Sequence, residues 1–157
     1  MHLLDTSPEH GENIDDIINE FIEDLNKADF VVAHNATFDM KMIKAEVMRL
    51  GRNDHMRVCP WLDTCYYGYQ LCQGKQANGR AKYPTLSELY FKVKGKEPEK
   101  VHDAAADVST LITGFYGLLT MPVEDKYHNV GPVLSETRIK LVIAKFKEKQ
   151  DEQQKAE

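Results

Sequence analysis

The sequence predicts a single α/β domain in which amphipathic helices pack on short buried strands. Two observations indicate this fold class: apolar residues recur at helical spacing along most of the chain, and two short apolar runs bounded by polar breaks interrupt that spacing. A chain of 157 residues is long enough for one hydrophobic core, and 42% apolar with 29% charged residues is ordinary for a soluble globular protein.

The first third of the chain is predicted to form a helix, a strand and a second helix. Residues 13–27 have apolar side chains at i, i+3, i+4, i+7, i+8 and i+11, the pattern of an amphipathic helix. The apolar run at residues 30–33 is typical of a short buried strand. Helical spacing returns over residues 36–50, and Gly51 is a natural stop just beyond it.

The middle of the chain is predicted to contain a second strand, a short helix and a loop. Residues 58–62 have strand character, although Pro60 favours an edge or irregular strand because proline cannot donate to a ladder. A helix is expected to continue over residues 66–71. Residues 74–84 are rich in Gly, Asn, Lys and Gln without periodicity, which indicates a loop.

Three further helices are predicted. A capping signal places the start of the first within residues 85–90, and apolar spacing places the other two at residues 104–119 and 135–147. Thr85 and Glu88 have the spacing of a capping box, and Asp103 is a natural N-cap. Residues 122–132 are expected to be irregular. The charged and amide-rich tail, residues 147–157, is expected to be frayed or disordered.

Charge and cysteine usage narrow the function classes. A net charge of −5 argues against a simple nucleic-acid coat protein, although a local basic cluster, Lys75, Arg80 and Lys82, leaves a nucleic-acid contact open beside the alternative of a solvated loop. The odd number of cysteines argues against a disulfide framework and for a reducing compartment. With no export or membrane-spanning pattern, we expect a cytoplasmic protein that does not interact with membranes.

A zinc site is the alternative role for the cysteines. It would combine Cys59, Cys65, Cys72 and His55, but the gaps between the cysteines are longer than the short spacing that zinc sites favour. We therefore expect three partly buried thiols instead.

Two stretches carry the chemistry, His34-Asn35-Ala36-Thr37-Phe38-Asp39 and His102-Asp103-Ala104-Ala105-Ala106-Asp107. They supply two carboxylates, the ligands that Mg²⁺ and Mn²⁺ prefer, and a histidine whose ordinary pKa lies near working pH. The first stretch lies where a strand ends and a helix begins, a common ligand position in open α/β sheets. Taken singly, Asp39 and Asp107 are also explained as acidic residues in the first turn of a helix, where the helix dipole favours a negative charge. Ala104, Ala105 and Ala106 would let the helix that begins near Asp103 approach the sheet closely. Phe38 is expected in the core.

In this order the two stretches resemble the second and third motifs of the DnaQ-like (DEDDh) 3′-to-5′ exonuclease family, which includes the proofreading subunit of bacterial DNA polymerase III. The resemblance implies that Asp39 and Asp107 are metal ligands, that His102 is the general base, and that two Mg²⁺ or Mn²⁺ ions fill a complete active site. Asn35 is a candidate contact to the terminal nucleotide, which makes it a substrate-binding residue.

The first motif of that family, Asp-x-Glu, has no counterpart here. Leu4-Asp5-Thr6-Ser7 has Ser where Glu is needed, so Asp5 is interpreted as a turn residue, and Asp63-Thr64 lies out of family order. The resemblance therefore implies an α/β, ribonuclease H-like exonuclease fold that is N-terminally truncated, with its first three strands missing. Residues 1–122 would form this exonuclease domain, and residues 123–157 a C-terminal helix and charged tail.

Two functions are compatible with these observations. The first is a 3′-to-5′ exonuclease that hydrolyses terminal phosphodiester bonds of DNA or RNA by two-metal-ion catalysis and needs its missing first motif. The alternative is a catalytically inactive module that binds nucleic acid or a polymerase. The expected partners are a nucleic-acid 3′ end and, as a second partner, either a polymerase subunit or a complementing N-terminal segment.

Overall fold

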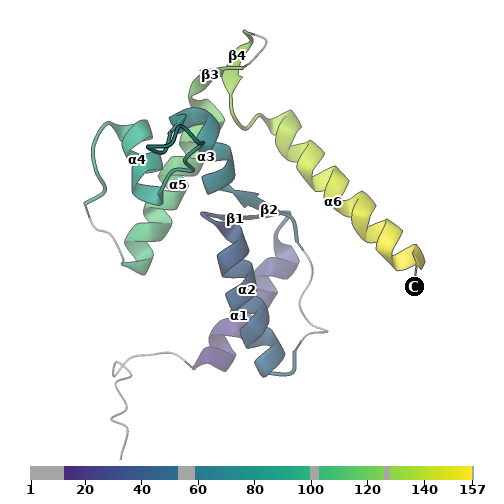
Figure 1. Ribbon diagram of the computed structural model, residues 1–157. Coiled ribbons are helices and arrows are strands. Elements are labelled where there is room, and N and C mark those ends of the chain that lie inside the picture. The colour runs from purple at the N-terminus through teal and green to yellow at the C-terminus, as the bar shows by residue number, and fades with distance from the viewer. Residues whose placement is uncertain (1–12, 53–58, 100–102, 126–127, 157) are drawn as a thin grey trace, which may run out of the picture.

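A computed structural model of the chain describes residues 13–52, 59–99, 103–125 and 128–156, without the side chains of 154–156. The described part contains both helices and short strands, which confirms the mixed α/β class (Figure 1). The elements in chain order are α1 (Ile14–Lys27), β1 (Val31–Ala33), α2 (Ala36–Arg49), β2 (Trp61–Asp63), α3 (Thr64–Cys72), α4 (Leu86–Lys94), α5 (Ala104–Thr120), β3 (Pro122–Glu124), β4 (Val130–Pro132) and α6 (Glu136–Ala156).

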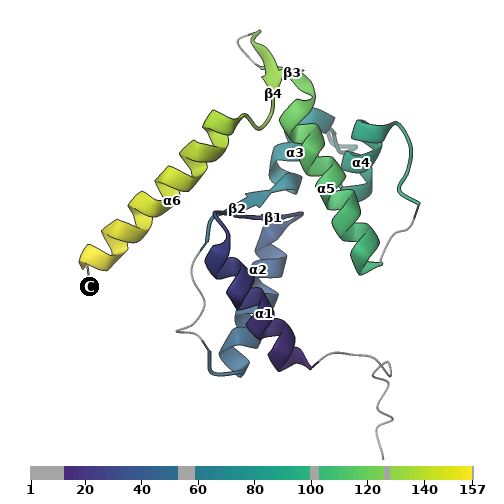
Figure 2. The ribbon, with the colours of Figure 1, turned by 180° about the vertical axis from the view of Figure 1, so that it is seen from behind.

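A two-stranded parallel sheet joins two groups of helices. Strands β1 and β2 pair in the register Val31↔Trp61 to Ala33↔Asp63. Figures 1 and 2 show this sheet between the α1/α2 pair on one side and α3, α4 and α5 on the other. The second strand begins at Trp61 because Pro60 has no N–H, and only the Pro60 carbonyl takes part, accepting from the Val31 N–H at 2.9 Å.

Each group of helices has its own apolar cluster. Ile18, Ile22 and Val47 are buried between α1 and α2. The second cluster lies among α3, α4, α5 and the segment before α6, and its buried members are Leu71, Leu89, Leu118, Val133 and Leu134. Helix α5 approaches α4 closely because it carries glycines there: a Cβ at Gly114 would lie 2.8 Å from a methyl carbon of Leu89.

The helix ends follow the signals read from the sequence. The capping box of α4 is present, with Thr85 Oγ1 accepting from the Glu88 N–H at 3.2 Å and the Glu88 carboxylate accepting from the Thr85 N–H at 2.8 Å. Asp103 caps α5 by accepting from the Ala106 N–H at 2.9 Å. Gly51 follows α2 with φ +67°, the left-handed conformation expected at that position.

Two segments differ from the sequence-based expectation. Residues 122–132 were expected to be irregular, but Pro122–Glu124 (β3) and Val130–Pro132 (β4) within this range pair as antiparallel strands, with Pro122 opposite Pro132. A pair of prolines fits a ladder position that needs no N–H donor, which hid the strands from a pattern reading. The tail, expected to be frayed or disordered, is helical to Ala156 because it contains strong helix formers and neither Gly nor Pro.

Helix α6 stands away from the other helices along most of its length (Figures 1 and 2). It is the longest described helix, but it carries many charges. No helix among the described residues combines the length and the apolar character needed to cross a membrane.

Candidate active site at the strand to helix junction

The first sequence motif lies where β1 ends and α2 begins, and a carboxylate from β2 holds it there. Asn35 is in the left-handed region with φ 66°, and its side chain makes no cap hydrogen bond. Instead, Asp63 accepts from the Asn35 N–H at 2.9 Å through Oδ1 and from the Ala36 N–H at 3.1 Å through Oδ2. Oδ1 also accepts from the Cys65 N–H at 2.9 Å, at the start of α3. One aspartate thus fixes the first turns of two helices.

The His34 side chain is a second tie across the same junction. Its Nδ1 lies 3.0 Å from Thr64 Oγ1, and its Nε2 lies 3.0 Å from the Pro84 carbonyl oxygen. A carbonyl oxygen only accepts, so Nε2 carries the hydrogen. The Thr64 hydroxyl, fully buried, also lies 3.2 Å from the Ala33 carbonyl oxygen. His34 is therefore engaged at both nitrogens.

Burial lowers the pKa of His34 below its ordinary value of 6.5, and the hydrogen bond to Pro84 and the charges of Asp63 and Asp39 oppose this only in part. A neutral ring follows at neutral pH, and its Nδ1 competes with the Ala33 carbonyl oxygen for the single hydrogen of the Thr64 hydroxyl. His34 acts as a structural tie in this arrangement rather than as a free base.

Asp39 lies in the first turn of α2 and is half-buried. Burial raises the pKa of its carboxyl above the ordinary 3.8; a backbone hydrogen bond of Asp39 itself opposes the shift, and the negative charge of Asp63 adds to it. Asp39 takes part in no ion pair among the described residues. A bound cation would offset the cost of charging this carboxyl.

Asp107 occupies the equivalent place on α5, in its first turn and half-buried. The alanines before it do not bring this end of the helix against the sheet as expected, because Ala104 and Ala105 are exposed. The close approach of α5 occurs further along, at the glycines that face α4. Phe38 is 61% exposed, so the prediction that it belongs to the core is wrong.

Three residues of the sequence-based predictions lie outside the described residues: His102, His55 and Asp5. Within the part of the chain that is described, no three His, Cys, Asp or Glu side chains gather as a metal site. The cysteines are free thiols, with Cys59 buried, and burial raises the pKa of Cys65 and Cys72.

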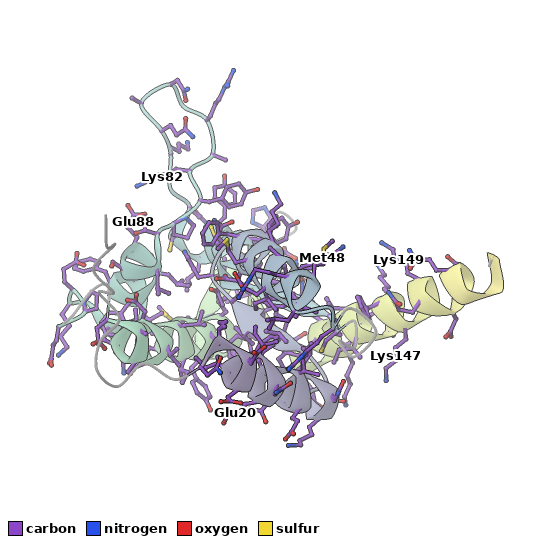
Figure 3. All side chains as sticks on the ribbon, turned by 90° about the horizontal axis from the view of Figure 1, so that it is seen from below. Glu20, Met48, Lys82, Glu88, Lys147 and Lys149 are labelled. Atoms are coloured by element: carbon purple, nitrogen blue, oxygen red, sulfur yellow. The ribbon has the colours of Figure 1, made fainter. Side chains whose placement is uncertain are left out.

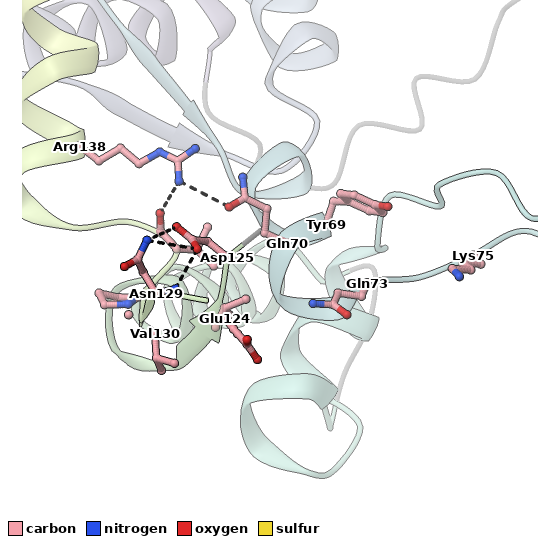
Figure 4. Close-up of a pocket in the computed structure, with 13 residues that line it drawn as sticks. Tyr69, Gln70, Gln73, Lys75, Glu124, Asp125, Asn129, Val130 and Arg138 are labelled. Carbon is pink, nitrogen blue, oxygen red and sulfur yellow. Dashed lines mark hydrogen bonds between the residues drawn. The ribbon is translucent and has the colours of Figure 1, made fainter. Parts of the chain in front are cut away.

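Another hollow, of about 710 Å³, lies apart from these residues, between the end of α3 and the β3–β4 hairpin (Figure 4). Arg138 lines one side of it, donating to the Val133 carbonyl at 2.8 Å and lying 5.2 Å from the centre of the Tyr67 ring. Neither Asn35, Asp39 nor Asp107 lines it. Its polar contacts link α6 to α3, where Arg138 donates to Gln70 Oε1 at 3.5 Å, and close the hairpin, where the Asn129 side chain donates to Asp125 Oδ2 at 3.1 Å.

Comparison with protein families decides the class. The family model described as Exonuclease (RNase T) matches residues 5–115, most of the chain. The chain belongs to this exonuclease family. The match includes Asn35, Asp39 and Asp107, and membership indicates a nuclease. No curated protein matches the chain.

In this exonuclease-family chain, sequence reasoning missed the structural parts of Asp63 and His34. Asp63 lies between the two recognised motifs, where the family has no metal ligand, so the sequence gives it no role. In the structure it accepts hydrogen bonds from Asn35 and Ala36 of the first motif. The signal that could have found it is its place as the last residue of a strand predicted to neighbour β1, since the carboxyl ends of adjacent parallel strands meet at one edge of a sheet.

Proposed function

We propose that this chain is a 3′-to-5′ exonuclease of the DnaQ-like type, similar to the proofreading subunit of bacterial DNA polymerase III, acting on DNA or RNA ends. The observation that carries the proposal is the pair of hydrogen bonds by which the Asp63 carboxylate holds the start of α2. It holds Asn35 in the left-handed conformation and so fixes the first turn of α2, where the half-buried Asp39 has a raised pKa and no cationic partner among the described residues.

Asp39 and Asp107 are the proposed metal ligands. Their hard carboxylate oxygens suit Mg²⁺ or Mn²⁺ in kind, and paired ions of this class activate water and stabilise the leaving oxygen in phosphodiester hydrolysis. They do not suffice in number, because the described residues gather no cluster of three ligands. We therefore propose that a complementing segment carrying Asp-x-Glu, a pair that residues 1–34 do not contain, supplies the remaining ligands.

His102 and Asn35 are assigned the remaining roles. His102 precedes the cap of α5 and would take the proton from the attacking water, since His34 is already engaged at both ring nitrogens. Asn35 would contact the terminal nucleotide, because its side chain is exposed and is not used as a cap.

The second candidate function is a catalytically inactive module that binds nucleic acid or a polymerase subunit. The incomplete ligand set among the described residues favours it. The two candidates differ in one measurable property, since only the first predicts metal-dependent release of nucleotides from a 3′ end.

Single-turnover degradation of end-labelled single strands in Mn²⁺ tests the proposal, with the chain alone and with a complementing segment that carries Asp-x-Glu. Loss of 3′ nucleotides is expected only in the completed protein. His102→Ala should slow it by roughly 10²- to 10⁴-fold, the range for loss of a general base, without changing metal affinity. Asp39→Asn and Asp107→Asn should weaken metal binding itself.

Asp151→Asn, an exposed position on α6, is the matched control for the loss of one carboxylate. If the completed protein releases no nucleotides but binds strands, the inactive module is the better description. If either Asp39→Asn or Asp107→Asn retains full activity, the assignment of metal ligands is refuted.

A further inference from the structure

We propose that residues 73–84, together with Tyr66 and Tyr69, form a binding surface for single-stranded nucleic acid beside the β1–α2 junction. This inference rests on the proposed nuclease function and names the form of substrate that the site receives. Residues 73–84 are called the basic arm below.

The basic arm is a backbone-bonded hairpin that projects from the body (Figure 3). At its base the Lys82 N–H donates to the Gly74 carbonyl at 3.0 Å, and Lys75 and Ala81 form an antiparallel bridge. Gly74 suits this base because a Cβ there would lie 3.0 Å from the Lys82 carbonyl oxygen. The tip turns at Gly79, where φ is +79°. Its side chains are therefore presented on a defined frame.

The charge of this segment is opposite to that of the whole chain. The chain carries −5, yet no Asp or Glu occurs between Asp63 and Glu88, where Lys75, Arg80 and Lys82 lie. Lys82 pairs with Glu88 at the base of the arm (Figure 3). Lys75 and Arg80 are exposed and take part in no ion pair among the described residues. Two exposed cations that form no ion pair within the described part of the chain, carried on a projecting hairpin, are suited to contact phosphates.

Three tyrosine rings lie in contact at the foot of the arm, of which Tyr66 and Tyr83 are stacked and Tyr69 is tilted by 56° against Tyr83. The Tyr83 ring lies 6.4 Å from that of Tyr66 at an interplanar angle of 25°, and 5.7 Å from that of Tyr69. Tyr66 is 56% exposed and Tyr83 is 51% exposed, although aromatic rings of this size are usually more buried. Exposed aromatic faces next to a basic groove or arm are the usual platform for unpaired bases.

The platform is anchored to the candidate active site. The Pro84 carbonyl, which follows Tyr83, accepts from His34 Nε2 at 3.0 Å and from the Cys65 thiol at 3.5 Å. His34 directly precedes Asn35, the proposed contact to the terminal nucleotide. A loop that served only solubility would need neither the stacked rings nor this tie. Single strands fit better than duplexes, because bases within a duplex stack on each other rather than on protein rings.

Fluorescence anisotropy of labelled oligothymidylate with the full chain, in EDTA, tests the charge of the arm. The double variant Lys75→Gln/Arg80→Gln should bind roughly tenfold more weakly at low salt and should show a salt dependence lower by about 1.4, since each lost phosphate contact on a single strand changes the slope by about 0.7. The control is Lys147→Gln/Lys149→Gln, which removes the same charge from exposed positions on α6 (Figure 3) and should bind as the parent does.

The tyrosines are tested in the same assay. Tyr83→Ala should weaken binding by roughly 5- to 100-fold, the range for loss of one stacked base, and Tyr83→Phe should restore it. Tyr116→Ala, which removes a tyrosine that is 60% exposed on α5, is the matched control and should leave binding unchanged.

The proposal would be overturned if the arm and α6 charge variants weakened oligothymidylate binding equally, or if the chain did not bind oligothymidylate. Equal binding of a duplex of the same length, or binding only to anionic lipid vesicles, would also overturn it. Because EDTA removes metal, these results do not depend on catalysis. A completed protein that degrades 3′ ends while its arm variants bind normally would retain the proposed function and lose this inference.

Discussion

Asp63→Asn is the sharpest test of how the candidate site is built. In the folded chain, Oδ1 accepts from two backbone N–H groups and Oδ2 accepts from the Ala36 N–H at 3.1 Å. Asparagine keeps the size but replaces one oxygen by an NH₂ group, which cannot accept. At least one charge-assisted hydrogen bond is lost, and the new NH₂ group faces a backbone N–H, so that two donors oppose each other. The expected loss in free energy of unfolding is about 1.5–3 kcal/mol.

Urea unfolding followed by circular dichroism measures this loss, and Asp103→Asn is its matched control. Asp103 accepts one N–H through one oxygen, from Ala106 at 2.9 Å, so an amide oxygen can replace it. Asparagine and aspartate are nearly equal as N-caps, and the control should cost less than about 0.5 kcal/mol. Equal losses in the two variants would show that Asp63 is an ordinary cap and does not hold the junction.

Three further outcomes are expected. The pKa of His34 is lowered from 6.5 in the folded chain, so the stability that its neutral ring confers is present above pH 6.5 and is lost as the pH falls through the folded pKa. The urea midpoints measured above and below pH 6.5 should therefore differ less in His34→Gln than in the parent. Gly114→Ala should destabilise by about 1–3 kcal/mol in urea unfolding, because the new Cβ meets buried Leu89, whereas Gly131→Ala, with open space, should be close to neutral. Calorimetric titration of the chain alone with Mn²⁺ should give weak binding at fewer than two sites, and two tight sites would show that ligands have been missed.

Local signals were enough to predict most helices and their ends. The period of apolar residues located α1, α2 and α5, and the cap residues Thr85 and Asp103 act as their side-chain chemistry suggests. Such features depend on neighbours within a few positions in the chain. The strand before Asn35 was predictable for the same reason, as a short apolar run between polar breaks.

Features that depend on distant segments were harder to predict. The part played by Asp63 follows from the register of two parallel strands, which places it beside Ala33 across the sheet. The exposure of Phe38 depends on what packs against α2, which helical spacing does not specify. The role of His102 stays a prediction, because this residue lies outside the described part of the chain.

The separation of the two apolar clusters has a consequence for cooperativity. The α1/α2 cluster and the α3–α5 cluster share no buried member. They are connected by the three-residue ladder of β1 and β2, the Asp63 and His34 hydrogen bonds, and the Phe30–Phe115 ring contact at 6.4 Å. We therefore expect the two units to open as separate foldons, with different protection of their amides against hydrogen exchange. Occupation of the junction by substrate would then tie the two units together, and the slow-exchanging amides of both would become protected at once.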